Sequence, residues 1–273
     1  AEDAAPPAEG PAPRAVGPAP PAAPASEGAE CVRVPGEAED GAGRAEAGAS
    51  EVRAAPMIVS AARSVLDFEA TCDDGVRVKP QEVIELPIVL VDAQSGAVVD
   101  EFHTYVRPVH HPRLTAFCTK LTGIQQGWVD EAPVWSEALV QAQEWLDMKL
   151  SELGWSTCAF VTCGHGDLQT MVVQQCAVSG QHVPERFRQW VNIKDVFRST
   201  LGKPGGGMAQ MLKELSLSPE GHHHSGLDDS RNIARILAAL LRRGATLDAS
   251  AVSSSAHPSG AGAKGLRTHC SDR

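Results

Sequence analysis

Apolar and polar positions divide the chain into a central region with regular periods and two flanks without them. Between residues 56 and 247, short apolar runs that suit β-strands are followed by stretches whose apolar residues recur every three or four positions, as in helices. The flanks, residues 1–55 and 248–273, show neither period. We therefore expect one folded domain over residues 56–247 between two disordered segments.

Three apolar runs open the predicted domain. Residues 64–71 (SVLDFEAT), 82–92 (EVIELPIVLVD) and 97–106 (AVVDEFHTYV) are short and rich in strand-forming residues. Their short connections predict an antiparallel meander. Pro87 lies within the second run, and a proline in a sheet favours an edge strand or a bulge.

Helical periods dominate after this meander. Residues 157–163 are a fourth apolar run typical of a strand, and residues 190–197 suit either a strand or a helix. Strands followed by alternating strands and helices predict an α/β domain with a mixed sheet flanked by helices. The expected helices cover residues 114–123, a segment that starts at Pro133, and residues 167–178, 208–215 and 228–243.

Composition supports the assignment of the flanks. Residues 1–30 contain eleven Ala, eight Pro and three Gly, which cannot bury enough apolar surface to offset the entropy of ordering. Residues 1–55 also carry 10 acidic and 4 basic groups, so much of the net charge of −10 lies outside the predicted domain. An acidic total argues against indiscriminate binding to nucleic acid, although a local basic patch remains compatible with it.

Cysteine usage and hydropathy restrict the compartment. The seven cysteines include no C-x-x-C pair, which argues against a disulfide framework or a zinc ribbon and favours free thiols in a reducing compartment. No apolar stretch approaches the length of a membrane span, and the first residues lack the apolar core of a signal peptide. We expect an intracellular protein, cytoplasmic or nuclear, that acts as a monomer and does not bind membranes.

Two carboxylates lie two positions apart inside the first apolar run. On a β-strand, Asp67 and Glu69 would project from the same face and repel each other. A hard divalent cation such as Mg²⁺ or Mn²⁺ is the usual partner for such a pair of oxygen ligands. The alternative is that one carboxylate points to solvent at the end of the strand.

Two further aspartates lie where expected elements begin. Asp167 follows the fourth strand at the start of a helix, where it can line a site or serve as an N-cap. Asp229 opens the last helix beside Asp228, and we expect one of the two to cap the helix and the other to be free for chemistry.

His224 lies in a loop five residues before Asp229, close enough to reach a metal cluster at the start of the last helix. Two other interpretations of His224 are a solvated side chain without a role and a chance run of histidines together with His222 and His223. Zinc binding by all three is less favoured, because consecutive residues rarely direct their side chains to one point.

The ordered set D-x-E, D and H-x4-D resembles the DEDDh family of 3′-to-5′ exonucleases, which have an RNase H-like fold. Within it, the chain is most similar to the Eri-type exoribonucleases and to their branch with a prion-protein-interacting member. The resemblance spans about residues 57–247. The segments that carry it are DFEATC (67–72), PQEVIELPIVLVD (80–92), DEFHTYVRP (100–108), LTAFCTKLTGIQ (114–125), TCGHGDLQTM (162–171) and HSGLDDSRNIARI (224–236).

This resemblance implies a mechanism. Asp67, Glu69, Asp167 and Asp229 would hold two Mg²⁺ or Mn²⁺ ions, with Asp67 bridging them, and His224 would take the proton from the attacking water. The substrate would be the 3′ end of single-stranded RNA or a short 3′ overhang, and the product a nucleoside 5′-monophosphate. Discrimination between RNA and DNA depends on a contact with the 2′-hydroxyl, and the motifs leave both open.

The resemblance also implies substrate contacts, with one departure from the family pattern. Related proteins usually carry Trp immediately before the third acidic residue, whereas this chain has Gly166. A stacking surface for the terminal base is therefore absent or replaced by His165. The other implied contacts are Phe68, Ala70 and Thr71 beside the terminal nucleotide and Phe117 and Leu121 beside its base, although core packing is an alternative for the last two.

Two other functions remain open at this point. A catalytically weak RNA-binding or scaffold protein that keeps the exonuclease fold is suggested by Gly166 and by the acidic, rather than basic, N-terminal segment. An RNase H-like endonuclease would cut a hybrid duplex internally, and the H-x4-D arrangement disfavours it.

Overall fold

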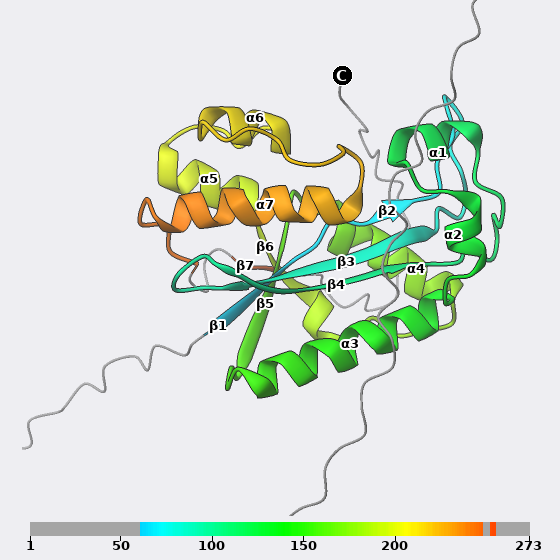
Figure 1. Cartoon of the computed structure of the whole chain (residues 1–273), viewed down its shortest axis with the longest axis horizontal. Coiled ribbons are helices and arrows are strands. Elements are labelled where there is room, and N and C mark those ends of the chain that lie inside the picture. Colours follow the sequence, from blue (N-terminus) through cyan, green and yellow to red (C-terminus); the bar gives the residue numbers. More distant parts are fainter. Residues whose placement is uncertain (1–60, 248–251, 255–273) are drawn as a thin grey trace, which may run out of the picture. The chain divides into compact units, whose positions relative to one another are not determined.

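The structure is a computed structural model that describes residues 61–247 and 252–254. A mixed seven-stranded sheet runs through this part of the chain (Figure 1). β1 pairs antiparallel with β3 and parallel with β5, and β4 pairs antiparallel with the other side of β3. Its strands are β1 (Ala61–Val65), β2 (Glu69–Ala70), β3 (Val83–Asp92), β4 (Val98–Tyr105), β5 (Thr157–Thr162), β6 (Gln189–Asn192) and β7 (Val252–Ser254).

Helices cover both faces of the sheet (Figure 1). One apolar cluster joins α3 and α4 to the sheet, and a second joins α5, α6 and α7 to its opposite face. The expected mixed sheet flanked by helices is therefore confirmed. The helices are α1 (Ala116–Thr122), α2 (Gln126–Asp130), α3 (Trp135–Glu152), α4 (Val172–Val178), α5 (Ile193–Leu201), α6 (Met208–Glu214) and α7 (Gly226–Leu241), with a π-helical turn at Gly166–Met171 and a 3₁₀ turn at Glu185–Arg188.

The first predicted strand is interrupted at the two carboxylates. β1 ends at Val65 and β2 begins at Glu69, and both pieces pair with β3. The pairing Val65 to Val89 and Glu69 to Glu85 puts Pro87 opposite the interruption. Since a proline has no N–H to donate, this position tolerates it. The expectation of an edge strand at Pro87 is wrong, because β3 has neighbours on both sides.

Several element boundaries differ from the expected ones. Residues 190–197 contain both a strand end and a helix, because β6 passes directly into α5. The five-residue helix α2 was not expected. β7 pairs with β6, so residues 252–254 of the predicted disordered tail are part of the sheet. The predicted disordered segment 1–55 and the rest of that tail lie outside the described residues.

Hydrophobicity along the described helices does not fit a membrane span. In residues 61–247 and 252–254, no helix combines the length and the apolar character that crossing a bilayer requires. The apolar residues of α7 instead face the sheet, and Ile233, Ile236, Leu237 and Leu240 are buried as the helical period predicts.

Candidate active site

Asp67 lies just before β2 and Glu69 is its first residue, and both converge with a third carboxylate from α7. One ligand oxygen from each of Asp67, Glu69 and Asp229 lies within 4.8 Å of the other two. The break in the first strand releases this segment from the ladder of β3, while the strands on either side hold its ends. We refer to these three residues as the carboxylate group.

Asp229 reaches the carboxylate group from the first turn of α7 and is buried. Its carboxylate accepts a hydrogen bond from the backbone N–H of His224 at 2.9 Å. The N-cap of α7 is Ser225, whose hydroxyl accepts from the N–H of Asp228. The expectation that Asp228 or Asp229 caps the helix is therefore wrong, because the helix begins earlier, at Gly226.

Asp167 lies beside the carboxylate group, on the π-helical turn that follows β5. Its side chain accepts a hydrogen bond from the backbone N–H of Phe68 at 3.1 Å, and its charge is one of the causes that raise the pKa of Asp67. Among the described residues it is not part of the group whose ligand atoms lie within 4.8 Å of one another. π-Helical turns are frequent at functional sites.

The electrostatics of the site favour a cation. Burial, followed by the charges of Asp167 and Asp229, raises the pKa of Asp67 well above its ordinary value. Burial and the charge of Asp67 raise the pKa of Glu69 to about 10, and burial raises that of Asp167 to about 6. A divalent cation would remove the repulsion among these anions, so the residues present fit a metal held by oxygen ligands.

His224 adjoins the carboxylate group and is half-buried. Burial and the neighbouring charge of His223 lower its pKa. The two imidazole rings are stacked, with centroids 4.0 Å apart and planes 25° apart. The ring of His223, rather than that of His224, donates a hydrogen bond to Asp229, with Nδ1 3.1 Å from Oδ2. Of the three adjacent histidines, His223 therefore makes a specific contact with Asp229.

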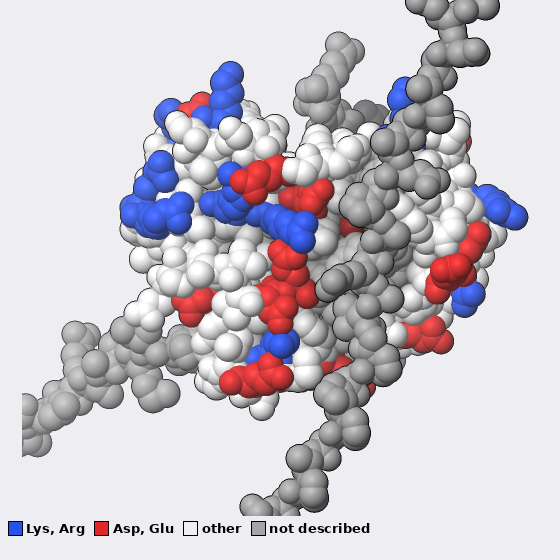
Figure 2. Space-filling view, viewed as in Figure 1, with Lys and Arg blue, Asp and Glu red and all other residues white. Residues whose placement is uncertain are grey.

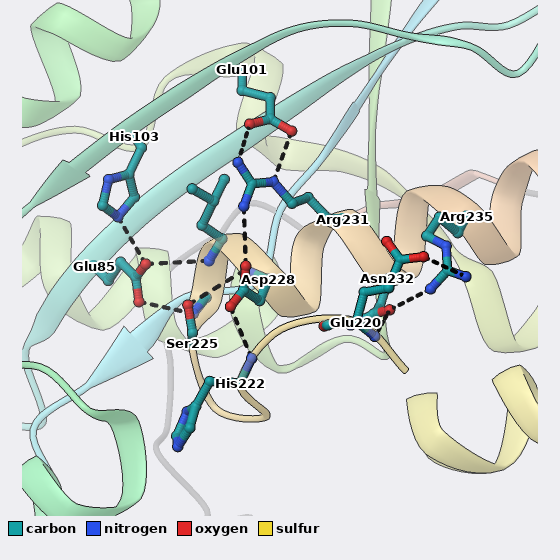
Figure 3. A network of polar contacts seen from close by, with 12 residues as sticks. Glu85, Glu101, His103, Glu220, His222, Ser225, Asp228, Arg231, Asn232 and Arg235 are labelled. Atoms are coloured by element: carbon teal, nitrogen blue, oxygen red, sulfur yellow. Dashed lines mark hydrogen bonds and ion pairs between the residues drawn. The ribbon is translucent and has the colours of Figure 1, made fainter. Parts of the chain in front are cut away.

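Glu85 anchors the helix that carries Asp229. It is buried on β3, and its carboxylate accepts hydrogen bonds from the N–H groups of Gly226 at 2.8 Å and Leu227 at 3.2 Å, at the start of α7 (Figure 3). A carboxylate is favoured at a helix N-terminus. His103 on β4 contacts the same carboxylate through Nε2 at 2.8 Å.

Gly226 fits closely between β3 and the segment that carries Asp67. A Cβ atom added there would lie 2.6 Å from the backbone oxygen of Asp67 and 3.1 Å from Oε2 of Glu85. This close approach brings the start of α7, and with it Asp229, next to Asp67.

Sequence reasoning missed three residues near the site. Glu85 is a charged residue inside an otherwise apolar buried run, and that pattern was the available signal. His223 is one of three adjacent histidines in the sequence, and no local signal points to its contact with Asp229. Lys194 on α5 lowers the pKa of Asp67 by its charge, and it is placed there only by the packing of α5.

The expected substrate contacts in and beside β2 are Phe68, Ala70 and Thr71, and all three are buried. The ring of Phe68 packs edge-on against Trp135 with centroids 6.0 Å apart, so it belongs to the core beneath the sheet. Ala70 and Thr71 are also buried, and the hydroxyl of Thr71 accepts from the N–H of Glu82 at 2.9 Å. The backbone N–H of Phe68 donates to Asp167, so the backbone of this segment takes part in the site.

The other expected contacts are more accessible. Phe117 and Leu121 lie one turn apart on α1, are half-buried, and do not belong to the apolar clusters of the described residues. His165 is exposed, and its Nδ1 accepts a hydrogen bond from the indole N–H of Trp190 at 3.1 Å. This bond fixes the orientation of the His165 ring.

Basic side chains on α7 are largely committed to ion pairs. Arg231 pairs with Glu101 at 2.6 Å and with Asp228 at 3.1 Å, and Arg235 pairs with Glu220 at 2.9 Å. Figure 2 shows the resulting band of alternating basic and acidic side chains over this face. Such a surface does not favour unselective binding of phosphates.

A mixed sheet between two layers of helices, with carboxylates that converge at the break of its first strand, is the architecture of an RNase H-like exonuclease domain. Residues 64–237 match the protein family described as Exonuclease, and the chain belongs to that family.

Curated relatives support the same class. The chain is 43% identical over 187 residues to ERI1 exoribonuclease 3 of Homo sapiens, which covers 66% of this chain and 53% of the relative. It is 35% identical over 195 residues to the 3′-5′ exonuclease Snipper of Drosophila melanogaster, covering 66% of this chain and 69% of the relative. The chain thus spans about half the length of the first of these relatives.

Solved structures confirm the fold. The nuclease domain of 3′hExo, a DEDDh family member bound to rAMP, superposes with a TM-score of 0.64 at 35% identity, covering 68% of this chain and 94% of that domain. A 3′-exonuclease that recognises the 3′ end of the histone mRNA stem-loop gives a TM-score of 0.64 at 32% identity. The superposition covers 72% of this chain and 91% of that one. The predicted RNase H-like fold and the resemblance to the DEDDh family are therefore confirmed.

Proposed function

We propose that this domain is a metal-dependent 3′-to-5′ exoribonuclease that releases nucleoside 5′-monophosphates from the 3′ end of single-stranded RNA or of short 3′ overhangs. The observation that carries the proposal is the approach of the Asp67, Glu69 and Asp229 oxygens to within 4.8 Å of one another in a chain of the Exonuclease family. The names of the relatives, and the rAMP bound to one of them, support the type of substrate and product.

We propose two Mg²⁺ or Mn²⁺ ions as cofactors. Asp67, Glu69 and Asp229 would hold them, together with Asp167 beside this group. When bound, the cations supply positive charge to the entering and departing oxygens of the phosphodiester. The raised pKa values of Asp67 and Glu69 support this role, because burial and, after it, the charges of neighbouring carboxylates cause them, and bound cations would offset both effects.

His224 is proposed to accept the proton of the attacking water. Its pKa is lowered by burial and by the charge of His223, which keeps the imidazole neutral and able to accept a proton near pH 7. The hydrogen bond from its backbone N–H to Asp229 would keep the ring beside the carboxylate group.

Substrate contacts are proposed on two sides of the site. The segment of Phe68, Ala70 and Thr71 would border the terminal nucleotide, mainly through its backbone. Phe117 and Leu121 on α1 would contact the base, and their partial exposure supports this over core packing. His165 would take the place of the missing Trp at Gly166, held in orientation by Trp190.

The partner is proposed to be an RNA with a free 3′ end. Free cysteines among the described residues, such as Cys72, Cys118 and Cys163, fit a reducing compartment, so we place the activity in the cytoplasm or the nucleus. We propose that the domain acts as a monomer and does not bind membranes.

A second candidate is an RNA-binding or scaffold protein with little turnover. It is favoured by Gly166 in the position of the usual aromatic residue. An end-labelled RNA incubated with Mg²⁺, Mn²⁺ or EDTA separates the two candidates. Mononucleotide release that EDTA abolishes supports the nuclease, whereas intact RNA that remains bound supports the scaffold.

The matched variants for this experiment are Asp67→Asn and Asp147→Asn. Asp147 is on α3, and its side chain is 62% exposed, far more than the aspartates of the site. Asp67→Asn should lower the rate at least about 100-fold, because one charge of the carboxylate group is lost, while Asp147→Asn should stay within about twofold. Equal rates in the two variants would refute the assignment of Asp67.

A further inference from the structure

Two adjacent histidines each bring one ring nitrogen close to the carboxylate of Asp229. His224 has a φ of +69°, in the left-handed region that only a few per cent of non-glycine residues adopt. Its ring stacks on that of His223 with centroids 4.0 Å apart and planes 25° apart. Side chains of adjacent residues in extended backbone point to opposite faces, so the left-handed residue accounts for this arrangement. Strained backbone of this kind is often found at functional sites.

The third member of this cluster is Asp229. Nδ1 of His223 lies 3.2 Å from Oδ1 and 3.1 Å from Oδ2 of Asp229, so the imidazole is in direct hydrogen-bond contact with the carboxylate. One ligand atom from each of His223, His224 and Asp229 lies within 4.8 Å of the others. The side chain of Asp229 is 4% exposed and that of His223 is 60% exposed, which leaves the cluster open to an ion arriving from solvent.

The donor set differs in chemistry from the carboxylate group. Two imidazole nitrogens and one carboxylate oxygen, with a water as fourth ligand, are a typical set for Zn²⁺. Mg²⁺ instead prefers oxygen ligands in an octahedral arrangement, and nitrogen-containing sites bind Zn²⁺ more tightly than Mn²⁺. Asp229 therefore belongs to two overlapping ligand sets that prefer different metals.

We propose that His223, His224 and Asp229 form a zinc site that competes with the carboxylate group for Asp229. Zinc would take the place of the Nδ1 proton of His223: that proton would pass to solvent while Nε2 takes one up, so the ring binds the ion as a neutral imidazole with its N–H on Nε2. The site uses two of the three adjacent histidines, His223 and His224, without His222, and it assigns a role to His223 that the proposed hydrolysis does not require.

Competition follows from the shared residues, and this consequence rests on the proposed function. A bound zinc ion would withdraw Asp229 from the carboxylate group and His224 from the attacking water. Micromolar zinc should therefore inhibit RNA hydrolysis in millimolar Mg²⁺. Zinc binding itself does not depend on the nuclease activity, so the two proposals can fail separately.

The test is a zinc titration of the full chain after chelator treatment and dialysis, in millimolar Mg²⁺ and without RNA. Zinc chloride is added, and binding is followed by calorimetry and by competition with a chromophoric chelator. The variants are His223→Ala and His222→Ala. His222 is the matched control because it belongs to the same exposed run but not to the cluster.

We expect His223→Ala to weaken the tightest site at least about tenfold and His222→Ala to change it less than about twofold. Histidines and cysteines elsewhere in the chain are common to both variants and cancel in the comparison. Equal zinc affinity in the wild type and His223→Ala would overturn the proposal, as would an equal loss in His222→Ala.

Cobalt substitution gives a second readout. Co²⁺ bound to a nitrogen-containing four-coordinate site gives visible absorption bands, which we expect in the wild type and in His222→Ala but not in His223→Ala. Bands that survive in His223→Ala would contradict the assignment. If zinc binds as expected but the Mg²⁺-loaded protein does not shorten RNA, the nuclease proposal fails and the zinc site stands.

Discussion

The carboxylate of Glu85 on β3 accepts a hydrogen bond from the backbone N–H of Gly226 at 2.8 Å, across 141 positions of the chain (Figure 3). This contact ties the start of α7 to the centre of the sheet and thereby sets where Asp229 meets Asp67. The position of the carboxylate group therefore depends on a residue that is not part of it.

Glu85→Ala should destabilise the Mg²⁺-bound protein by about 2–3 kcal/mol, because buried N–H groups of α7 lose a charged acceptor. Without a cation, removing Glu85 would also relieve its repulsion of the carboxylate group, and this gain would mask the loss of the hydrogen bonds. Magnesium is included to prevent that. Chemical denaturation measures the free energy of unfolding. Glu101→Ala is the control, since its ion pair with Arg231 is partly exposed and should contribute about 0–1 kcal/mol. Equal effects would contradict the anchoring role of Glu85.

A methyl group at Gly226 should disturb both the fold and the site. Gly226→Ala places a Cβ 2.6 Å from the backbone oxygen of Asp67, and such overpacking typically costs about 1–3 kcal/mol. Gly127 on α2 is the matched control, because nothing lies within 4 Å of an added Cβ there. Gly127→Ala should be neutral or stabilise by about 0.4–1 kcal/mol. Thermal unfolding with and without Mg²⁺ distinguishes the two, and a neutral Gly226→Ala would show that α7 can move away from β3.

His224→Ala should remove most of the hydrolysis rate while leaving Mg²⁺ binding largely intact, because the residue is proposed to move a proton rather than to hold the cation. General base catalysis typically contributes about 10²- to 10⁴-fold, so a loss in that range is expected. Single-turnover rates on RNA and calorimetric Mg²⁺ binding are measured together, with His222→Ala as control. Near-full activity in His224→Ala would exclude it as the base.

The stability of the metal-free protein should fall as the pH rises. Burial raises the pKa of Asp167 to about 6 and that of Glu69 to about 10, whereas unfolded carboxyls titrate near pH 4. Between these values the folded state binds more protons than the unfolded state. The contribution of the two carboxyls to the stability is therefore complete below about pH 4 and is lost as the pH rises through their pKa values in the folded state.

The measurement is the melting temperature in EDTA from pH 5 to pH 8. In a domain of this size 1 kcal/mol shifts the melting temperature by about 2–4 °C, so a decrease of several degrees is expected. Magnesium should reverse the decrease at pH 8, because cation binding favours the ionised carboxylates. Asp67→Asn should show a shallower slope. A melting temperature that rises steadily over this range in EDTA would contradict the electrostatic account.

The strands and helices with a clear hydrophobic pattern were predictable from the sequence. The apolar runs at β3, β4 and β5 and the helical period of α7 depend on which residues can be buried, and that property is local. The resemblance of the D-x-E and H-x4-D motifs to DEDDh exonucleases implied that Asp67, Glu69, Asp167 and Asp229 would share a site, and ligand oxygens of Asp67, Glu69 and Asp229 lie within 4.8 Å of one another.

Other features depend on contacts that a local pattern does not contain. The break at Asp67 arises where Pro87 of β3 lies opposite the strand. The anchoring by Glu85 requires the start of α7 to be packed on β3. The convergence of His223 and His224 depends on one left-handed residue, and β7 depends on pairing with β6. In each case tertiary contacts decide the outcome.

The direction and the starting point of hydrolysis test the account most directly. Two RNA molecules of identical sequence are compared in Mg²⁺, one linear with a 5′ label and a free 3′ hydroxyl, the other closed into a circle. The account predicts that the linear RNA shortens one nucleotide at a time from its 3′ end, with nucleoside 5′-monophosphates as products, while the circle stays intact. Cleavage of the circle, or loss of the 5′ label as the first product, would contradict it.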